Sequence, residues 1–222
     1  MKILKVNLLQ DFSDAIREAV AVLKSGGTVV YPTDTVYGIG CNACDYKAVE
    51  IIYRIKDRPL EKPLSVIARN IAWIKELAIV PTKLEPLLEK LWPGAITVIL
   101  PKKSLIPAIV TADAPNVGLR VPDYELTEKL MAKFGYPLIS TSANISSSSA
   151  EASDDKEAGN SRWVIETFKP RMWQPDLMLD AGELPPSPPS TIIDFSSVKP
   201  RILRIGPVKP KQLETILGIK FQ

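Results

Sequence analysis

Cationic side chains gather in one short stretch of this 222-residue chain. Lys56, Arg58 and Lys62 lie close together, and Pro59 and Pro63 interrupt the stretch. In an extended segment Lys56 and Arg58 would point to the same side, and proline lowers the entropy cost of holding charges against a ligand. The spacing therefore favours a phosphate site, with a solvated basic turn as the alternative.

A hydroxyl-rich segment precedes these cations along the chain. Residues 28–31 are β-branched and aromatic, which is typical of a buried strand, and Pro32 has no N–H to continue the ladder. A polar loop, two spaced glycines and a helical apolar pattern over residues 48–55 follow. A strand, polar loop, helix and basic loop in this order predict an anion-binding cleft beside a sheet.

The residue types that are missing restrict the chemistry. The chain has no histidine, so Ser-His-Asp and Cys-His catalysis are excluded. Cys41 and Cys44 have no second pair to complete a tetrahedral metal site, and we expect two reduced thiols. Asp34 is expected to cap a turn rather than to act as a general base. Chemistry that depends on positioning and charge neutralisation is therefore favoured.

Two nucleotide-binding fingerprints can be weighed against the sequence. Gly38-Ile39-Gly40 formally opens a dinucleotide fingerprint, but residues 32–36 separate it from the preceding strand. The chain contains no G-x-x-x-x-G-K-[ST] sequence, so it is not a P-loop enzyme. We therefore expect neither a Rossmann site nor a P-loop.

A series of motifs resembles the YrdC/Sua5 family, whose enzymes are threonylcarbamoyl-AMP synthases. The motifs occur in one order along almost the whole chain. A single matching motif would be weak evidence, whereas a series in this order is hard to attribute to chance. They are Tyr31-Pro32-Thr33-Asp34-Thr35-Val36-Tyr37-Gly38 with Lys56-Asp57-Arg58-Pro59 and Lys62-Pro63-Leu64, then Trp92-Pro93-Gly94, Val117-Gly118-Leu119-Arg120-Val121-Pro122, Ser140-Thr141-Ser142-Ala143-Asn144, Ser190-Thr191-Ile192-Ile193-Asp194 and Ile202-Leu203-Arg204.

The resemblance implies a role for individual residues. Lys56 and Arg58 would serve catalysis. ATP would be bound by Arg58, Lys62, Asn116, Ser142, Asn144 and Arg204. L-Threonine would be held by Thr35, Tyr37, Arg120, Ser140 and Ser190, with Arg120 suited to its carboxylate. No side chain is expected to bind a metal directly, and Mg²⁺ would arrive with ATP.

The reaction that the resemblance implies uses the substrate itself as nucleophile. The amine of L-threonine takes up bicarbonate or carbon dioxide to give a carbamate, whose oxygen attacks the α-phosphorus of ATP, and pyrophosphate leaves. We therefore expect a nucleotidyltransferase that forms threonylcarbamoyl-AMP. A separate transferase would pass the group to adenosine 37 of certain tRNAs.

Several positions depart from the family pattern. Ile67 stands where many members carry histidine, and Asn116 and Ala150 replace common nucleotide contacts. Ser147 replaces a glycine, and the Pro-Ser-Pro-Pro run at 186–189 replaces the usual glycine and glutamate. These changes leave room for a paralogue of the YciO type. Two further alternatives are an RNA-binding module that uses the same basic face, and a carbamoyl-adenylate enzyme related to hydrogenase maturation proteins.

The remaining sequence predicts the fold. Composition is that of a globular protein, with 45% hydrophobic and 24% charged residues and a net charge of +3. The sequence shows neither a signal peptide nor an apolar run of membrane-spanning length, and few cysteines fit the cytoplasm. We expect an α/β (α+β) chain in one domain, 1–222, without the C-terminal domain of larger members. By resemblance the fold is a twisted mixed sheet flanked by helices, with a concave basic face.

The expected elements follow from pattern and punctuation. Strand-like runs lie at 2–8, 28–31, 64–68, 95–100, 117–121, 138–141, 177–180, 191–194 and 202–205. Helices are expected after Ser13 or Asp11, over 48–55, after Asn70, after a Thr82-Lys83-Leu84-Glu85 capping box, after Asp123 and over 210–217. Residues 146–161 are serine-rich and acidic, and we expect a mobile loop there.

Overall fold

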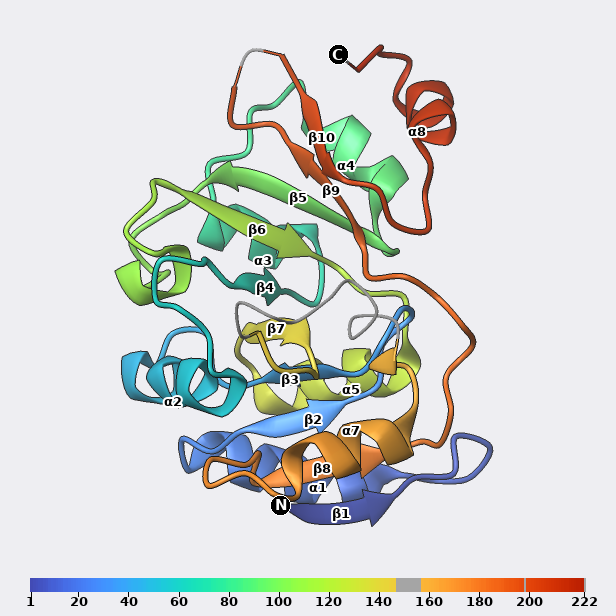
Figure 1. The fold of residues 1–222 in the computed structure, drawn as a ribbon. Coiled ribbons are helices and arrows are strands. Elements are labelled where there is room, and N and C mark those ends of the chain that lie inside the picture. The colour runs from blue at the N-terminus through green and yellow to red at the C-terminus, as the bar shows by residue number, and fades with distance from the viewer. Residues whose placement is uncertain (147–156, 198, 222) are drawn as a thin grey trace.

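The computed structural model describes residues 1–146, 157–197 and 199–221. Its ten strands are hydrogen-bonded in the order β1-β8-β2-β3-β7-β4-β6-β5-β9-β10, and Figure 1 shows them stacked from one end of the molecule to the other. Helices flank this twisted sheet on both faces (Figure 1). The predicted mixed sheet with flanking helices is confirmed.

The strands are short, and the sheet contains both parallel and antiparallel pairs. Parallel pairs join β1 to β8, β2 to β8, β4 to β6 and β5 to β9, and the other neighbours are antiparallel. Their bounds are β1 Lys2–Lys5, β2 Val29–Tyr31, β3 Gly38–Gly40, β4 Ser65–Ile67, β5 Ile96–Pro101, β6 Asn116–Arg120, β7 Leu138–Ser142, β8 Leu177–Asp180, β9 Thr191–Asp194 and β10 Arg201–Arg204. All except β3 fall at predicted positions.

Strand β3 replaces the glycine loop that the sequence predicted. A Cβ at Gly40 would lie 1.9 Å from the carbonyl oxygen of Ile139 in β7, so only glycine lets the two strands approach this closely. The same carbonyl accepts a hydrogen bond from the Tyr31 hydroxyl at 2.9 Å. Gly40 therefore serves strand packing, and Gly38 to Gly40 form a strand rather than a turn that opens a helix.

Six of the described helices were predicted, and one helix and a 3₁₀ turn were not. The bounds are α1 Ser13–Lys24, α2 Tyr46–Lys56, α3 Ile71–Leu77, α4 Glu85–Leu91, α5 Glu125–Phe134, α7 Ser161–Phe168 and α8 Pro210–Leu217, with η1 Ala108–Thr111. The unpredicted elements are α7 and η1. Residues 147–156 of the segment expected to be mobile lie outside the described residues.

Helix caps were predicted with mixed success. Asn70 caps α3 by accepting from Trp73 N, as predicted, and Gly135 ends α5 with a φ of 84°. The predicted caps of α1, α4 and α5 are wrong, because none of these helices has a side-chain cap. Asp11 instead accepts from the backbone and hydroxyl of Ser13, which forms a local turn before α1.

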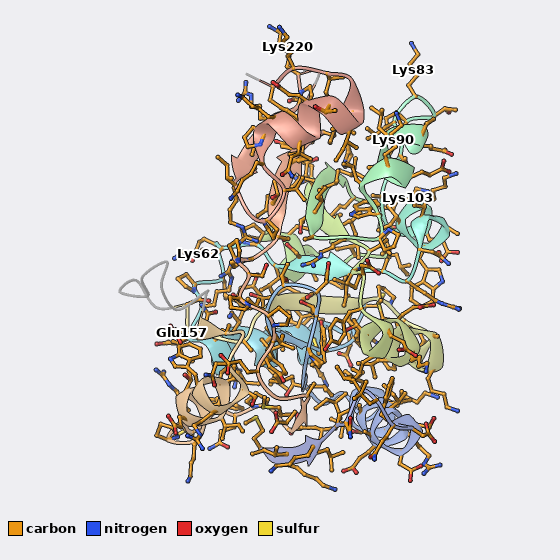
Figure 2. The ribbon with its side chains drawn as sticks, turned by 90° about the vertical axis from the view of Figure 1, so that its right-hand side faces the viewer. Lys62, Lys83, Lys90, Lys103, Glu157 and Lys220 are labelled. Carbon is orange, nitrogen blue, oxygen red and sulfur yellow. The ribbon has the colours of Figure 1, made fainter. Side chains whose placement is uncertain are left out.

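Strand β2 is buried on both faces of the sheet. In β2, Val29 and Tyr31 belong to a core formed with α1 and α5, while Val30 belongs to the larger core on the other face. Figure 2 shows the molecule from the side, with α1, α3, α4 and α5 on one face and α7 on the opposite face. Among the described residues, no helix is both long and apolar enough to cross a membrane.

Candidate active site

An open cavity of about 370 Å³ lies over the central strands of the sheet. Its volume is within the range of small-molecule sites. Nine of the twelve predicted site residues line it, and they come from segments far apart in the chain. These nine are Thr35, Arg58, Lys62, Arg120, Ser140, Ser142, Asn144, Ser190 and Arg204. The structure therefore brings most of the predicted site into one place.

Hydroxyl groups form the floor of the cavity, next to Gly118 of β6. Ser65 in β4 pairs with Ser140 in β7 on one side and with Gly118 in β6 on the other. A Cβ at Gly118 would lie 2.9 Å from Ser65 Oγ and 3.3 Å from a methyl group of Thr97, so a side chain there would fill the floor. Sequence analysis missed Ser65 and Thr97, although a lone serine in an apolar strand was the available signal.

The basic loop after α2 is folded around the guanidinium of Arg58. Arg58 Nε donates to Lys62 O at 3.0 Å, Nη2 donates to Pro63 O at 2.8 Å, and Nη1 lies 3.3 Å from Ser146 Oγ. Figure 2 shows Lys62 on the α7 face, away from Lys83, Lys90 and Lys103. The loop therefore presents Arg58 and Lys62 along one edge of the cavity.

Lys56 has a different position from the one that sequence spacing predicted. It is the last residue of α2 and is fully buried, and Asp57 after it is left-handed with a φ of 49°. The prediction that Lys56 and Arg58 point to one side of an extended segment is therefore wrong. Lys56 Nζ donates to Ser142 O at 2.5 Å and to both the carbonyl and side-chain oxygens of Asn144 at 2.8 Å. Lys56 supports the Ser142–Asn144 loop from beneath and is not part of the cavity lining.

Arg120 is held in the cavity wall by three fixed partners. Its Nε donates to Gly94 O at 3.0 Å, its Nη1 donates to Thr35 Oγ1 at 3.2 Å, and its Nη2 forms an ion pair with Asp34. Burial lowers the pKa of Arg120, Asp34 opposes that shift, and the charge of Arg204 adds to it. The three partners therefore orient the guanidinium before any ligand binds.

Asp34 does not have its predicted role. Thr33 Oγ1 makes the local turn contacts, by accepting from Thr35 N and donating to Val36 O. Asp34 instead pairs with a residue 86 positions away. A long-range ion pair of this kind cannot be read from local spacing.

Arg204 reaches the cavity through an irregularity in β10. Ile202 pairs with Ile193 and Arg204 pairs with Ile192, so Leu203 is an extra residue, a β-bulge. Ile193 faces the core and Ile192 faces the cavity, and the bulge aligns Arg204 with the cavity side. There its Nε donates to Ser190 O at 3.0 Å, and Ser190 Oγ shares a hydrogen bond of 2.7 Å with Thr97 Oγ1.

Tyr37 and Asn116 are not brought to the cavity. The Tyr37 hydroxyl donates to Gly182 O at 2.7 Å and accepts from Ala181 N at 3.0 Å, so it anchors the connection from β8 to β9. Burial raises the pKa of Tyr37, which keeps the hydroxyl protonated. Asn116 begins β6 opposite Pro101 and is not among the lining residues.

The positions that depart from the family pattern fall in different places. Ile67 and Pro189 line the cavity. Ser147 and Ala150 lie outside the described residues. Cys41 and Cys44 are free thiols, as predicted, and burial raises the pKa of both.

The cavity wall suits anionic ligands rather than a directly bound metal. Its described lining residues include Arg58, Lys62, Arg120 and Arg204 but no carboxylate. Within residues 1–146, 157–197 and 199–221 no group of three or more potential metal-binding side chains occurs.

Comparison with known proteins gives a consistent family match. Residues 21–206 match the Sua5/YciO/YrdC family model, which is described as "Telomere recombination". The threonylcarbamoyl-AMP synthase of Pyrococcus abyssi is 32% identical over 204 residues, covering 91% of this chain and 57% of the relative. That of Bacillus subtilis is 32% identical over 205 residues, covering 91% and 56%. The chain therefore spans little more than half the length of these relatives.

Solved structures show the same similarity. P. abyssi Sua5 complexed with L-threonine superposes with a TM-score of 0.88 at 30% identity, covering 100% of this chain and 63% of that protein. Escherichia coli YciO superposes with a TM-score of 0.79 at 25% identity, covering 96% and 98%. The fold is shared along nearly all of the chain.

Proposed function

This chain belongs to the Sua5/YciO/YrdC family, and from that membership we propose that it is a threonylcarbamoyl-AMP synthase. It would form threonylcarbamoyl-AMP and pyrophosphate from L-threonine, bicarbonate or carbon dioxide, and ATP, which makes it a nucleotidyltransferase. The observation that carries the proposal is one cavity with a cationic edge, a floor of hydroxyl groups and a buried arginine.

The cationic edge fits the triphosphate. Arg58 and Lys62 come from the loop after α2, and Arg204 comes from β10. At ~4 Å and an effective dielectric near 20, one cation–anion contact contributes about 4 kcal/mol gross, and desolvation and ordering remove much of it. Several such contacts are therefore needed to gather anionic substrates. Mg²⁺ bound to the phosphates would neutralise part of their charge.

The cavity wall around Arg120 fits L-threonine. Arg120 can bind the carboxylate, because its three present hydrogen bonds leave two of the five guanidinium N–H groups for a ligand. Ser140 and Ser65 on the floor offer hydroxyl groups that donate or accept. P. abyssi Sua5 binds L-threonine, which supports the same assignment for this fold.

The chain contributes placement and charge to the reaction. In the proposed step the carbamate oxygen of the substrate attacks the α-phosphorus, and the electron pair of the broken P–O bond leaves on pyrophosphate. The rigid guanidinium groups of Arg58 and Arg204 can stabilise the negative charge that develops on the phosphate oxygens. Holding both substrates in one cavity converts a bimolecular step into an intramolecular one. The product would pass to a transferase acting on tRNA, and the two free thiols fit a cytoplasmic enzyme.

A YciO-like activity with a different acceptor is the second candidate. It is favoured by the superposition of E. coli YciO along 96% of this chain, and by Ile67 in the cavity wall. Such an enzyme would bind ATP at the same cationic edge. It would not release pyrophosphate in response to threonine.

Pyrophosphate release from ATP and bicarbonate, measured with and without L-threonine, separates these candidates. We expect release that depends on threonine. Arg58→Ala should abolish it. The melting temperature should fall only slightly, because the hydrogen bonds of the half-buried Arg58 lie within a surface loop. Arg54→Ala is the matched control, because Arg54 pairs with Glu50 on the surface of α2 and does not line the cavity. ATP binding without threonine-dependent release would favour the YciO-like candidate.

A further inference from the structure

Asp34 places a negative charge directly behind the cationic wall of the cavity. Of the ion pairs between described residues, only the pair of Asp34 and Arg120 includes a cavity-lining side chain. Both partners are largely buried, with 14% of the Asp34 side chain and 9% of the Arg120 side chain exposed. Solvent therefore screens this pair much less than it screens the surface pairs.

The pair changes what Arg120 offers to a ligand. Asp34 offsets the guanidinium charge, yet it occupies only one N–H. Arg120 therefore still has two N–H groups for the cavity, but the local net charge of the pair is near zero. The ion pair therefore presents hydrogen-bond donors with little net charge, unlike an unpaired guanidinium.

We propose that Asp34 is a specificity-determining residue that excludes phosphate groups from the Arg120 end of the cavity. A single carboxylate needs only two aligned donors, which Arg120 keeps. A phosphate group carries more negative charge, and Asp34 repels it. The triphosphate is thereby kept on the edge formed by Arg58 and Lys62, and the wall around Arg120 stays open for the amino acid.

This inference rests on the proposed function, in which Arg120 receives the threonine carboxylate. Phosphate exclusion can nevertheless be tested independently of the proposed reaction, because phosphate binding is measured without turnover. The Asp34→Asn variant keeps an oxygen that can accept from Arg120 Nη2 and removes only the charge. Asp123→Asn is the matched control, since it makes the same change at an exposed carboxyl outside this cavity.

The experiment is calorimetric titration of the protein with inorganic phosphate, in the absence of ATP and threonine. We expect Asp34→Asn to gain a second phosphate site, with affinity at the Arg120 end increased by about tenfold or more, and Asp123→Asn to behave as wild type. The gained site should disappear in the double variant Asp34→Asn/Arg120→Gln. Unchanged phosphate stoichiometry and affinity in a folded Asp34→Asn protein would refute the proposal.

A measurement on the wild-type protein covers the case in which the variant does not fold. Binding of L-threonine is titrated with and without millimolar phosphate. We expect phosphate to leave the threonine affinity unchanged, and displacement of threonine by phosphate would overturn the assignment of Asp34. Absence of threonine binding together with a gained phosphate site in Asp34→Asn would refute the proposed function but support phosphate exclusion.

Discussion

Replacing Lys56 with methionine tests whether this buried cation supports the segment from Ser142 to Asn144 or acts on the reacting atoms. The ammonium group donates to three oxygens of Ser142 and Asn144 at 2.5–2.8 Å, and its side chain is fully buried. Methionine is similar in length but leaves those acceptors without their donor. Each buried acceptor that loses its partner costs about 1–3 kcal/mol, and breaking a buried charged network costs about 3–5 kcal/mol in total.

The expected consequence is a combined loss of stability and nucleotide affinity. For a domain of this size, 1 kcal/mol shifts the melting temperature by about 2–4 °C, so Lys56→Met should melt about 10 °C lower. The KM for ATP should rise, because Ser142 and Asn144 lose their fixed position in the cavity wall. Lys62→Met is the matched control: Lys62 is exposed, so its replacement should raise the KM for ATP without changing the melting temperature.

The two measurements are made on the same preparations, by differential scanning calorimetry and by steady-state pyrophosphate release. A Lys56→Met protein with wild-type melting temperature and wild-type KM for ATP, but a much reduced kcat, would refute the supporting role. That result would assign Lys56 to catalysis, as the sequence resemblance implied.

Three further perturbations test other parts of the structure. Arg120→Ala should raise the KM for L-threonine by at least about tenfold more than the KM for ATP, because a charged hydrogen bond to the carboxylate is lost, and an equal rise in both would contradict the assignment. Gly40→Ala should lower the free energy of unfolding in urea by more than about 3 kcal/mol, since its Cβ would meet a backbone oxygen at 1.9 Å, whereas Gly218→Ala, with open space around its Cβ, should cost about 1 kcal/mol for its left-handed backbone. Because burial raises the pKa of Cys44, its alkylation rate should keep rising at pH values where free cysteine has reached its plateau, and a profile like that of free cysteine would disprove this burial effect.

Local pattern predicted those parts of the fold in which neighbouring residues decide the structure. The bounds of β9 and α8 match the expected ranges 191–194 and 210–217. The cap at Asn70 was also predictable, because its side chain bonds to a backbone N–H three residues later. Strand β3 was missed because the need for Gly40 arises from a distant strand. The Ile139 carbonyl in β7 lies so close to Gly40 that only glycine fits.

The candidate site was predicted as a set of residues more accurately than as a geometry. The expected alternation of side chains in an extended segment is wrong for Lys56 and Arg58. The left-handed Asp57 separates the buried end of α2 from the loop that follows. Regular alternation along β10 would place Arg204 on the same face as Ile202. The β-bulge at Leu203 moves Arg204 to the other face, so alternation would predict this side chain wrongly as well. The Asp34 ion pair depends on a residue far along the chain, so spacing could not predict it.

The pairing of β1 with β8 has a consequence for how the chain is made. Lys2 to Lys5 are aligned with Leu177 to Asp180, and β2 uses the same partner strand. During synthesis on a ribosome, β1 and β2 therefore cannot pair with β8, which lies between them, until residue 180 has emerged. Until then an edge of β2 is open to pairing with other chains, which makes nascent or truncated forms prone to aggregation. The loop that carries Thr35 follows β2 directly, so we expect the cavity wall around Thr35 to become rigid only after β8 has paired with β2.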